Sequence, residues 1–220
     1  MRVFLFLLAL AAPATAQEAR IVVLGDSIME WNGESSVAAV MQREFGQRVR
    51  DESVSGAQFS HRMRLLVGPM DIRAQLPGRG FEWVVMTGGG NDLAVDCDCN
   101  ACADVLDGLI TADGTLGDIP DFAEQVTASG TNILWAQYYD APLGGGPFSA
   151  CADEFAELAT RLNRLANRLP GVHVTDLGGA IDPSDLTLYD PDRLHPSPEG
   201  SALIGRWIAR EINALSRRSN

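Results

Sequence analysis

The chain of 220 residues contains no lysine, and all 17 of its basic residues are arginine. This absence excludes sites that depend on a lysine amine, such as a Schiff-base lysine, a P-loop lysine or the lysine of a protein kinase. The basic residues are outnumbered by 29 acidic ones, which gives a formal net charge of −12. A chain this acidic is unsuited to nucleic acid or to an anionic membrane surface as its main partner.

The sequence also lacks an apolar run long enough to span a bilayer. The run at residues 3–12 is too short for that. It follows Met1 and Arg2 and precedes a proline and the small residues 14–16, an order typical of a cleaved signal peptide. We expect residues 1–16 to be removed, a mature chain from about Gln17, no membrane anchor, and a periplasmic or secreted protein. The alternative is a buried first strand.

Cysteine is scarce, with only four residues in the chain. In an exported protein they favour disulfides. A Cys97–Cys99 ring would be very tight, so we predict a local bridge that is either Cys97–Cys102 or Cys99–Cys102, and a second bridge from this segment to Cys151. A zinc site made by the four thiolates is the alternative, although a C-x-C-x-x-C segment with one distant cysteine matches no common zinc pattern.

Short apolar segments alternate with helical patterns along the rest of the chain. Strands are predicted over residues 21–24, 48–54, 81–87, 132–138 and 172–177. Helices are predicted over residues 37–45, 122–128, 155–169 and 198–215. This alternation predicts an α/β fold, with a central five-stranded parallel sheet between two layers of helices. Because no repeat or long linker divides the chain, we expect residues 17–220 to form a single domain.

Polar residues and glycines stand where the predicted strands end. Ser27, Gly56 and Asn91 follow the first three strands, and Asp192 and His195 precede the last helix. Ligands of a parallel sheet bind beyond the carboxyl ends of its strands. A nucleophilic hydrolase needs a hydroxyl, an imidazole base, a carboxylate and donors for an oxyanion. Each residue alone has an ordinary explanation as a cap, a turn or a surface group, but their joint placement favours a catalytic site.

These motifs resemble the SGNH/GDSL hydrolases, a superfamily of esterases, lipases, thioesterases and carbohydrate acetylesterases. The family's Gly-Asp-Ser is matched at residues 25–27, its Gly-x-Asn-Asp at 89–92 and its Asp-x-x-His at 192–195, while Gly56 matches the glycine of the second block. The resemblance covers nearly the whole mature chain and implies the three-layer α/β/α sandwich of that family. The second block lacks the asparagine often seen there, and residues 28–31 are not a common form, which leaves the subfamily open.

The resemblance implies a role for each matched residue. Ser27 is the nucleophile, His195 the base and Asp192 the carboxylate that orients it, while the Ser27 and Gly56 N–H groups and the Asn91 side chain form the oxyanion hole. Such a serine hydrolase needs no metal and no organic cofactor. The implied substrate is a small-molecule or glycan ester, with a carbohydrate O-acetylesterase as the main alternative to a carboxylic esterase, followed by a thioesterase or lysophospholipase. We expect a monomer.

Other residues of these chemical types have simpler interpretations. Trp31, Tyr138 and Tyr139 follow strands and could line a substrate cleft or equally lie at the edge of the core. His61 lies among arginines and is expected to be solvated, and His173 lies inside a predicted strand, where a structural role is expected. Two non-hydrolase classes stay open: a secreted binding module that has lost catalysis, and a redox or metal protein built on the cysteines.

Overall fold

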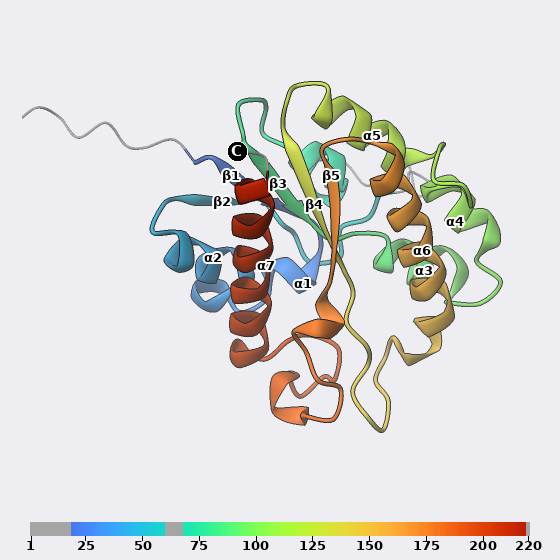
Figure 1. Ribbon diagram of the computed structural model, residues 1–220. Coiled ribbons are helices and arrows are strands. Elements are labelled where there is room, and N and C mark those ends of the chain that lie inside the picture. Colours follow the sequence, from blue (N-terminus) through green and yellow to red (C-terminus); the bar gives the residue numbers. More distant parts are fainter. Residues whose placement is uncertain (1–18, 60–67, 219–220) are drawn as a thin grey trace, which may run out of the picture.

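The structure, a computed structural model, describes residues 19–59 and 68–218 (Figure 1). The predicted signal peptide and His61 lie outside the described residues. Five parallel strands form one sheet in the order β2-β1-β3-β4-β5, an order typical of flavodoxin-like folds. They are β1 (Ile21–Leu24), β2 (Val49–Asp51), β3 (Trp83–Met86), β4 (Asn132–Gln137) and β5 (Val172–Asp176).

Helices cover both faces of this sheet, which confirms the predicted three-layer sandwich (Figure 1). One face carries α1 (Ser27–Glu30), α2 (Val37–Phe45) and α7 (Pro198–Arg218), and the other carries α3 (Gly90–Cys97), α4 (Ala103–Leu109), α5 (Asp118–Thr127) and α6 (Ala152–Arg168). Successive residues of β1 alternate between the two cores: Val23 packs with α2 and α7, and Val22 with α5 and α6. Both faces of the central strands are therefore buried, as parallel sheets require.

Short 3-10 turns complete the architecture. They are η1 (Gly33–Ser35), η2 (Gly68–Met70), η3 (Ile72–Gln75), η4 (Ser149–Cys151), η5 (Leu177–Gly179) and η6 (Leu186–Leu188). The loops after β4 and β5 lie at the lower edge of the sheet in Figure 1, together with α1 and the start of α7. This is the carboxyl edge of the strands, where the sequence places the candidate catalytic residues.

Three helices were not predicted. The first, α1, is a single turn, too short for a periodic signal. The second, α3, begins at Gly90, directly after Gly89, which has a left-handed φ of 99°. In the sequence, these consecutive glycines indicate a turn and not the start of a helix. The third, α4, spans seven residues and begins directly after Cys102. The predicted helix over 122–128 begins earlier, at Asp118, and β2 is shorter than the predicted 48–54.

The cysteines form the two predicted kinds of disulfide. Cys97–Cys102 is the local bridge, and Cys99–Cys151 joins the loop between α3 and α4 to the residue before α6. All four cysteines are thus bonded to one another and not to zinc. Within the described residues, no group of three or more His, Cys, Asp or Glu side chains is arranged to hold a metal ion.

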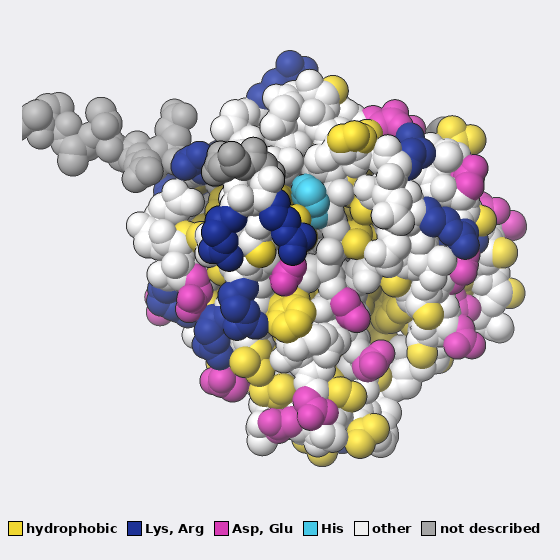
Figure 2. Space-filling view, viewed as in Figure 1, with side chains coloured by type: hydrophobic (Ala, Val, Ile, Leu, Met, Phe, Trp, Pro, Cys, Tyr) yellow, Lys and Arg dark blue, Asp and Glu magenta, His cyan; other side chains and the backbone are white. Residues whose placement is uncertain are grey.

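The described surface is acidic at the edge where the loops after β4 and β5 lie. In Figure 2 both charges occur on the visible face, but acidic side chains without basic ones lie at its lower end. Of the helices in the described ranges, none combines the length and the apolar content needed to cross a membrane.

Candidate active site

The turn from β1 into α1 places Ser27 at the carboxyl edge of the sheet. Gly25 has a φ of 129°, and a Cβ at this position would lie 2.7 Å from the Thr87 hydroxyl oxygen, so only glycine fits. Asp26 caps α1, because its side chain accepts a hydrogen bond of 3.1 Å from the Ile28 N–H. Ser27 is the first residue of this helix and lines a cavity at the carboxyl edge of the sheet.

Asp192 and His195 meet as the sequence spacing predicts. The Nδ1 atom of His195 lies 2.5 Å from Oδ2 of Asp192. The other carboxylate oxygen accepts hydrogen bonds of 3.0 Å from the backbone N–H groups of Leu194 and His195. Partial burial raises the pKa of Asp192, but these hydrogen bonds together outweigh it and lower the pKa below its usual value. The carboxylate therefore stays ionised and fixes the Nδ1 edge of the imidazole.

The expected nucleophile and base do not form a hydrogen-bonded pair: Ser27 lines the cavity, and His195 is not among the residues that line it. Among the described residues, the Ser27 hydroxyl makes no hydrogen bond with His195. Such contacts are often long before substrate binds and tighten in the reacting complex. His195 instead stacks on Trp31, with ring centroids 3.8 Å apart.

Two segments far apart in sequence dock together around Asn91. The Asn91 Nδ2 donates to the Ala57 carbonyl at 2.9 Å, and the Gln58 Nε2 donates to the Asn91 carbonyl at 3.0 Å. The buried Asp92 carboxylate accepts the N–H of Phe59. These bonds hold Gly56, which has a left-handed φ of 79°, next to the segment that carries Asn91. In the described part of the chain, the N–H groups of Ser27 and Gly56 donate no hydrogen bond, so they are available to an oxyanion.

A half-buried tyrosine joins the Ser27 turn to the Asn91 helix. The Tyr138 hydroxyl donates to Asp26 and accepts a hydrogen bond of 3.1 Å from the Gly90 N–H. Burial raises the pKa of Asp26, while hydrogen bonds from Tyr138, Ile28 and Thr87 act in the opposite direction. Burial likewise raises the pKa of Tyr138 well above its usual value, so its hydroxyl stays protonated and can donate. Sequence reasoning missed this link, because no short-range pattern connects residues 26 and 138.

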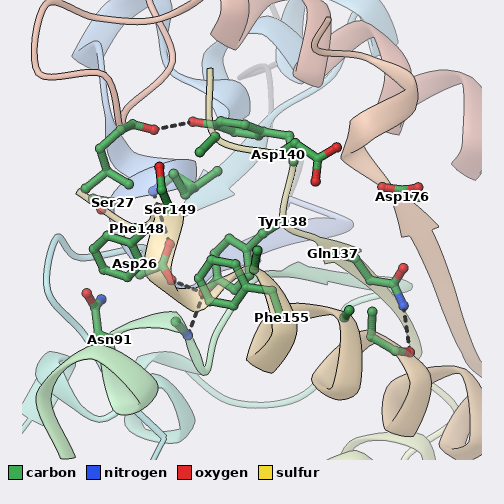
Figure 3. A pocket seen from close by; sticks show the side chains of 18 of the residues that line it. Asp26, Ser27, Asn91, Gln137, Tyr138, Asp140, Phe148, Ser149, Phe155 and Asp176 are labelled. Atoms are coloured by element: carbon green, nitrogen blue, oxygen red, sulfur yellow. Dashed lines mark hydrogen bonds between the residues drawn. The ribbon is translucent and has the colours of Figure 1, made fainter. Parts of the chain in front are cut away.

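A cavity of about 260 Å³ opens beside Ser27 (Figure 3). The rings of Tyr138, Phe155 and Phe148 stack in a row along it, with centroids 4.9 Å and 6.0 Å apart. Asn91 and Phe148 lie at one end in Figure 3, and three polar side chains lie at the other: Gln137, Asp140 and Asp176. The cavity thus combines an aromatic wall with a polar end.

The aromatic residues singled out from the sequence have different positions. Tyr138 and Tyr139 line the cavity, and the Tyr139 hydroxyl donates to the Leu194 carbonyl at 2.8 Å. Trp31 is not among the residues that line it. Phe148 and Phe155 were missed as cavity residues. Phe155 belongs to the apolar stripe of α6, and its place near the start of that helix, just after a glycine-rich loop, is the signal that could have found it.

The remaining histidine and carboxylates lie apart from His195. His173 lies in β5 near the Trp83 ring, at a centroid distance of 5.6 Å, and burial lowers its pKa. Asp182 and Asp185 accept hydrogen bonds from neighbouring residues of their own loops. Only Asp192 contacts His195 among the carboxylates of the described residues.

Comparison with known proteins identifies the family and the fold of the chain. The model of the GDSL-like Lipase/Acylhydrolase family matches residues 23–203. A carbohydrate acetylesterase from Sinorhizobium meliloti has a similar fold, with a TM-score of 0.59, 17% identity, and 90% of this chain and 100% of that chain covered. An aryl esterase from M. smegmatis is similar at a TM-score of 0.61 and 15% identity, covering 90% of this chain and 100% of that one. No curated protein sequence matches the chain.

The family model extends over most of the chain and includes all the blocks found in the sequence. The fold expected from the resemblance is the one observed, since solved structures align with nearly the full chain. The chain therefore belongs to the GDSL-like lipase/acylhydrolase family and is a hydrolase of the SGNH/GDSL type that acts on ester bonds.

Proposed function

We propose that this hydrolase is an exported serine esterase that cleaves carboxylic esters through an acyl-enzyme at Ser27. His195 accepts the Ser27 proton as the serine oxygen attacks the ester carbonyl. Asp192 holds the imidazole in the tautomer that leaves Nε2 free to accept this proton, and stabilises the imidazolium that forms. The imidazolium then protonates the departing alcohol. Water, activated by the same histidine, releases the acid and regenerates the enzyme.

The charge that develops on the carbonyl oxygen is assigned to three donors. These are the N–H groups of Ser27 and Gly56 and the Asn91 side-chain amide. One N–H of that amide is used by the Ala57 carbonyl, which orients the group and leaves its second N–H for the oxyanion. Donors fixed before the reaction stabilise the transition state without reorganisation.

The short contact between His195 Nδ1 and Asp192 Oδ2 carries this proposal, since it orients an imidazole at the edge where Ser27 opens into the cavity. The test is Ser27→Ala, assayed with p-nitrophenyl acetate. We expect kcat to fall on the order of a thousandfold or more, with the thermal midpoint of unfolding nearly unchanged. A folded Ser27→Ala variant with near-normal kcat would end the serine-hydrolase proposal.

A carbohydrate O-acetylesterase is the second candidate. It is supported by the cavity, which combines an aromatic row with three polar side chains that could hold hydroxyl groups, Gln137, Asp140 and Asp176. One of the proteins with a similar fold is a carbohydrate acetylesterase. Comparing kcat/KM for acetylated sugars, short-chain esters, long-chain esters and thioesters decides between the two. Export and a monomeric state belong to the same proposal, and the two disulfides are compatible with an oxidising compartment.

A further inference from the structure

The indole of Trp31 lies flat against the imidazole of His195. The ring centroids are 3.8 Å apart and the two planes differ by 9°. Trp31 directly follows α1, and its backbone N–H donates to the Ser27 carbonyl at 2.9 Å. Ser27 and Trp31 are therefore four residues apart on one helical turn and share a side of it. A single short helix thus carries both the proposed nucleophile and a ring that covers the proposed base.

The residue after Trp31 fastens the same helix end to the chain beyond His195. Asn32 has a left-handed φ of 74°, and its Nδ2 donates to the Pro196 carbonyl at 2.9 Å and to the Ser201 hydroxyl at 2.8 Å. His195 is therefore held on three sides: by the Trp31 ring on its plane, by Asp192 at Nδ1, and through the backbone of the next residue. The imidazole plane is set by α1 as well as by its own loop.

The geometry of the stack suits a charged imidazole better than a neutral one. Neutral aromatic pairs prefer offset or edge-to-face arrangements. A cation, in contrast, is attracted to the negative face of an aromatic ring, and most strongly to tryptophan. In the proposed reaction His195 is cationic only while it holds the Ser27 proton. The contact is then stronger in the transition state than in the ground state, which is the condition for raising kcat.

We infer that Trp31 is a positioning residue of the reaction, which fixes the plane of His195 and stabilises its protonated form. This inference rests on the proposed function of Ser27 and His195. Because Trp31 stacks on His195 and is not among the residues that line the cavity, its effect is expected on the base and not on substrate binding.

The test compares Trp31→Leu, which removes the ring, with Trp31→Phe, which keeps a smaller one. For Trp31→Leu we expect kcat for p-nitrophenyl acetate to fall about 10-fold. KM should stay within about twofold of wild type, because the substitution removes no contact with the bound substrate. Trp31→Phe should restore most of kcat. Labelling of Ser27 by a small fluorophosphonate should slow by the same factor as kcat, because it needs the base but few substrate contacts. Should Trp31→Leu fail to fold, Trp31→Met is measured in its place.

Two controls separate this role from ordinary packing. Trp207 is another half-buried tryptophan, on α7, whose Nε1 donates to the Thr175 hydroxyl. We expect Trp207→Leu to lower the thermal midpoint and leave kcat unchanged. In a His195→Ala background, Trp31→Leu should cause no further loss, since the group that it acts on is gone.

The inference is overturned if Trp31→Leu keeps wild-type kcat or raises KM alone. It is also overturned if Trp31→Leu lowers kcat by the same factor in the His195→Ala background as in the wild-type protein. Failure of the proposed function looks different. In that case Ser27→Ala would keep its activity, or the wild-type protein would not react with the fluorophosphonate at all.

Discussion

On the side of the sheet covered by α1 and α7, which we call the catalytic side, Ser27 and His195 follow capping or orienting residues close to them in the chain, Asp26 and Asp192. The stack of Trp31 on His195 is the long-range contact of this side. On the side covered by α3 and α6, the cavity wall depends on links between residues about fifty positions apart. One of these is the disulfide between Cys99 and Cys151. The expected catalytic residues thus stand in short motifs, whereas the shape of the cavity on the second side, which we call the wall side, depends on tertiary contacts.

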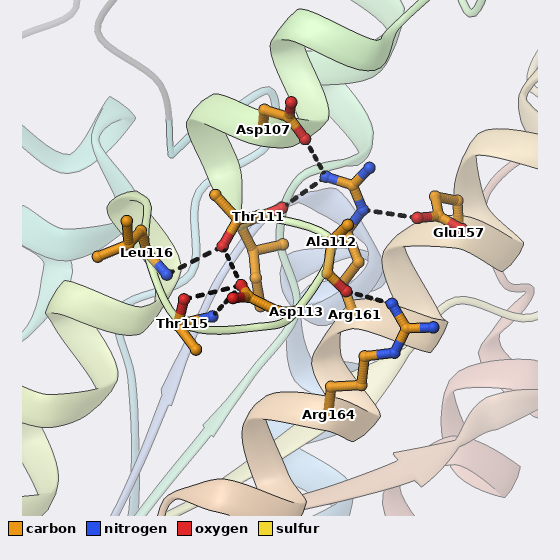
Figure 4. Close-up of polar contacts among 10 residues, drawn as sticks. Asp107, Thr111, Ala112, Asp113, Thr115, Leu116, Glu157, Arg161 and Arg164 are labelled. Carbon is orange, nitrogen blue, oxygen red and sulfur yellow. Dashed lines mark hydrogen bonds and ion pairs between the residues drawn. The ribbon is translucent and has the colours of Figure 1, made fainter.

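The helix α6 and the loop before it are anchored in two further ways. Arg161 is buried, and its guanidinium donates to Asp107, Glu157 and the Ile110 carbonyl (Figure 4). The bonds to Asp107 and Ile110 fix the middle of α6 against the end of α4. On the opposite side, Arg193 donates to the carbonyls of Leu143 and Gly145, which holds the loop before α6 against the Asp192–His195 turn. The aromatic row lies between these two sets of contacts. We therefore expect substitutions on this side to change stability and KM more than kcat.

The largest effect is expected at Asp192, on the catalytic side. Asp192→Asn keeps the shape of the side chain but loses the charge, and its amide can donate to Nδ1 and favour the tautomer that cannot accept a proton from Ser27. We expect kcat to fall by ~10³–10⁴, with KM changed little. Steady-state kinetics with p-nitrophenyl acetate measure it. A variant within tenfold of wild type would mean that another group orients His195.

Asn91 comes next, on the boundary between the two sides. Asn91→Asp replaces an oxyanion donor by a negative charge at nearly constant volume, so kcat should fall by about 10²–10³. The contact with the Ala57 carbonyl is also lost, so the thermal midpoint is measured in parallel. Wild-type kcat in this variant would show that residues 88–92 serve as a structural turn only.

The disulfides test the wall side directly, because they close loops of very different length. Replacing Cys99 and Cys151 by serine opens a separation of 52 residues and should lower the free energy of unfolding by roughly 4 kcal/mol on the loop-entropy model. The matched control, serine at Cys97 and Cys102, opens a separation of 5 and should lower it by roughly 2 kcal/mol. Denaturant unfolding measures both.

The KM and kcat values of the same two variants show whether the wall side affects substrate binding or the reaction itself. The serine pair at 99 and 151 should raise KM for bulky esters and leave kcat for p-nitrophenyl acetate nearly unchanged. Equal losses of kcat in both pairs would contradict the division between a catalytic side and a wall side.

The separation in sequence between contacting residues explains what could be predicted from the sequence. The bounds of β1 and α2 agree with the prediction, because buried β-branched runs and caps such as Ser36 are local signals. The Asp192–His195 contact follows from a three-residue spacing. The stack of Trp31 on His195 joins residues 164 positions apart, and no spacing rule finds such a pair. The Phe148 wall could not be predicted either, since it depends on where a loop is anchored.

The smallest effect is expected where Tyr138 joins the two sides. Tyr138→Phe removes the hydrogen bond to Asp26 and leaves the Gly90 N–H without its acceptor. We expect the free energy of unfolding to fall by about 1–2 kcal/mol near pH 7. The change should depend on pH. Burial raises the pKa of Asp26 and the Tyr138 hydrogen bond opposes this, so the variant should have a still higher pKa at Asp26.

A carboxyl group whose pKa is raised in the folded state binds its proton more tightly there than in the unfolded chain, so stability falls as pH rises from the unfolded value of about 3.8 through the folded pKa. Tyr138→Phe should therefore lose more stability than wild type between pH 4 and pH 7, and the difference between them should be smaller at pH 4. Tyr139→Phe is the matched control, because its hydroxyl donates to the Leu194 carbonyl and not to a carboxylate. Tyr139→Phe should lose the same free energy of unfolding, relative to wild type, at pH 4 and at pH 7. A Tyr138→Phe deficit equally independent of pH would show that Tyr138 acts through the Gly90 N–H alone and does not hold the charge of Asp26.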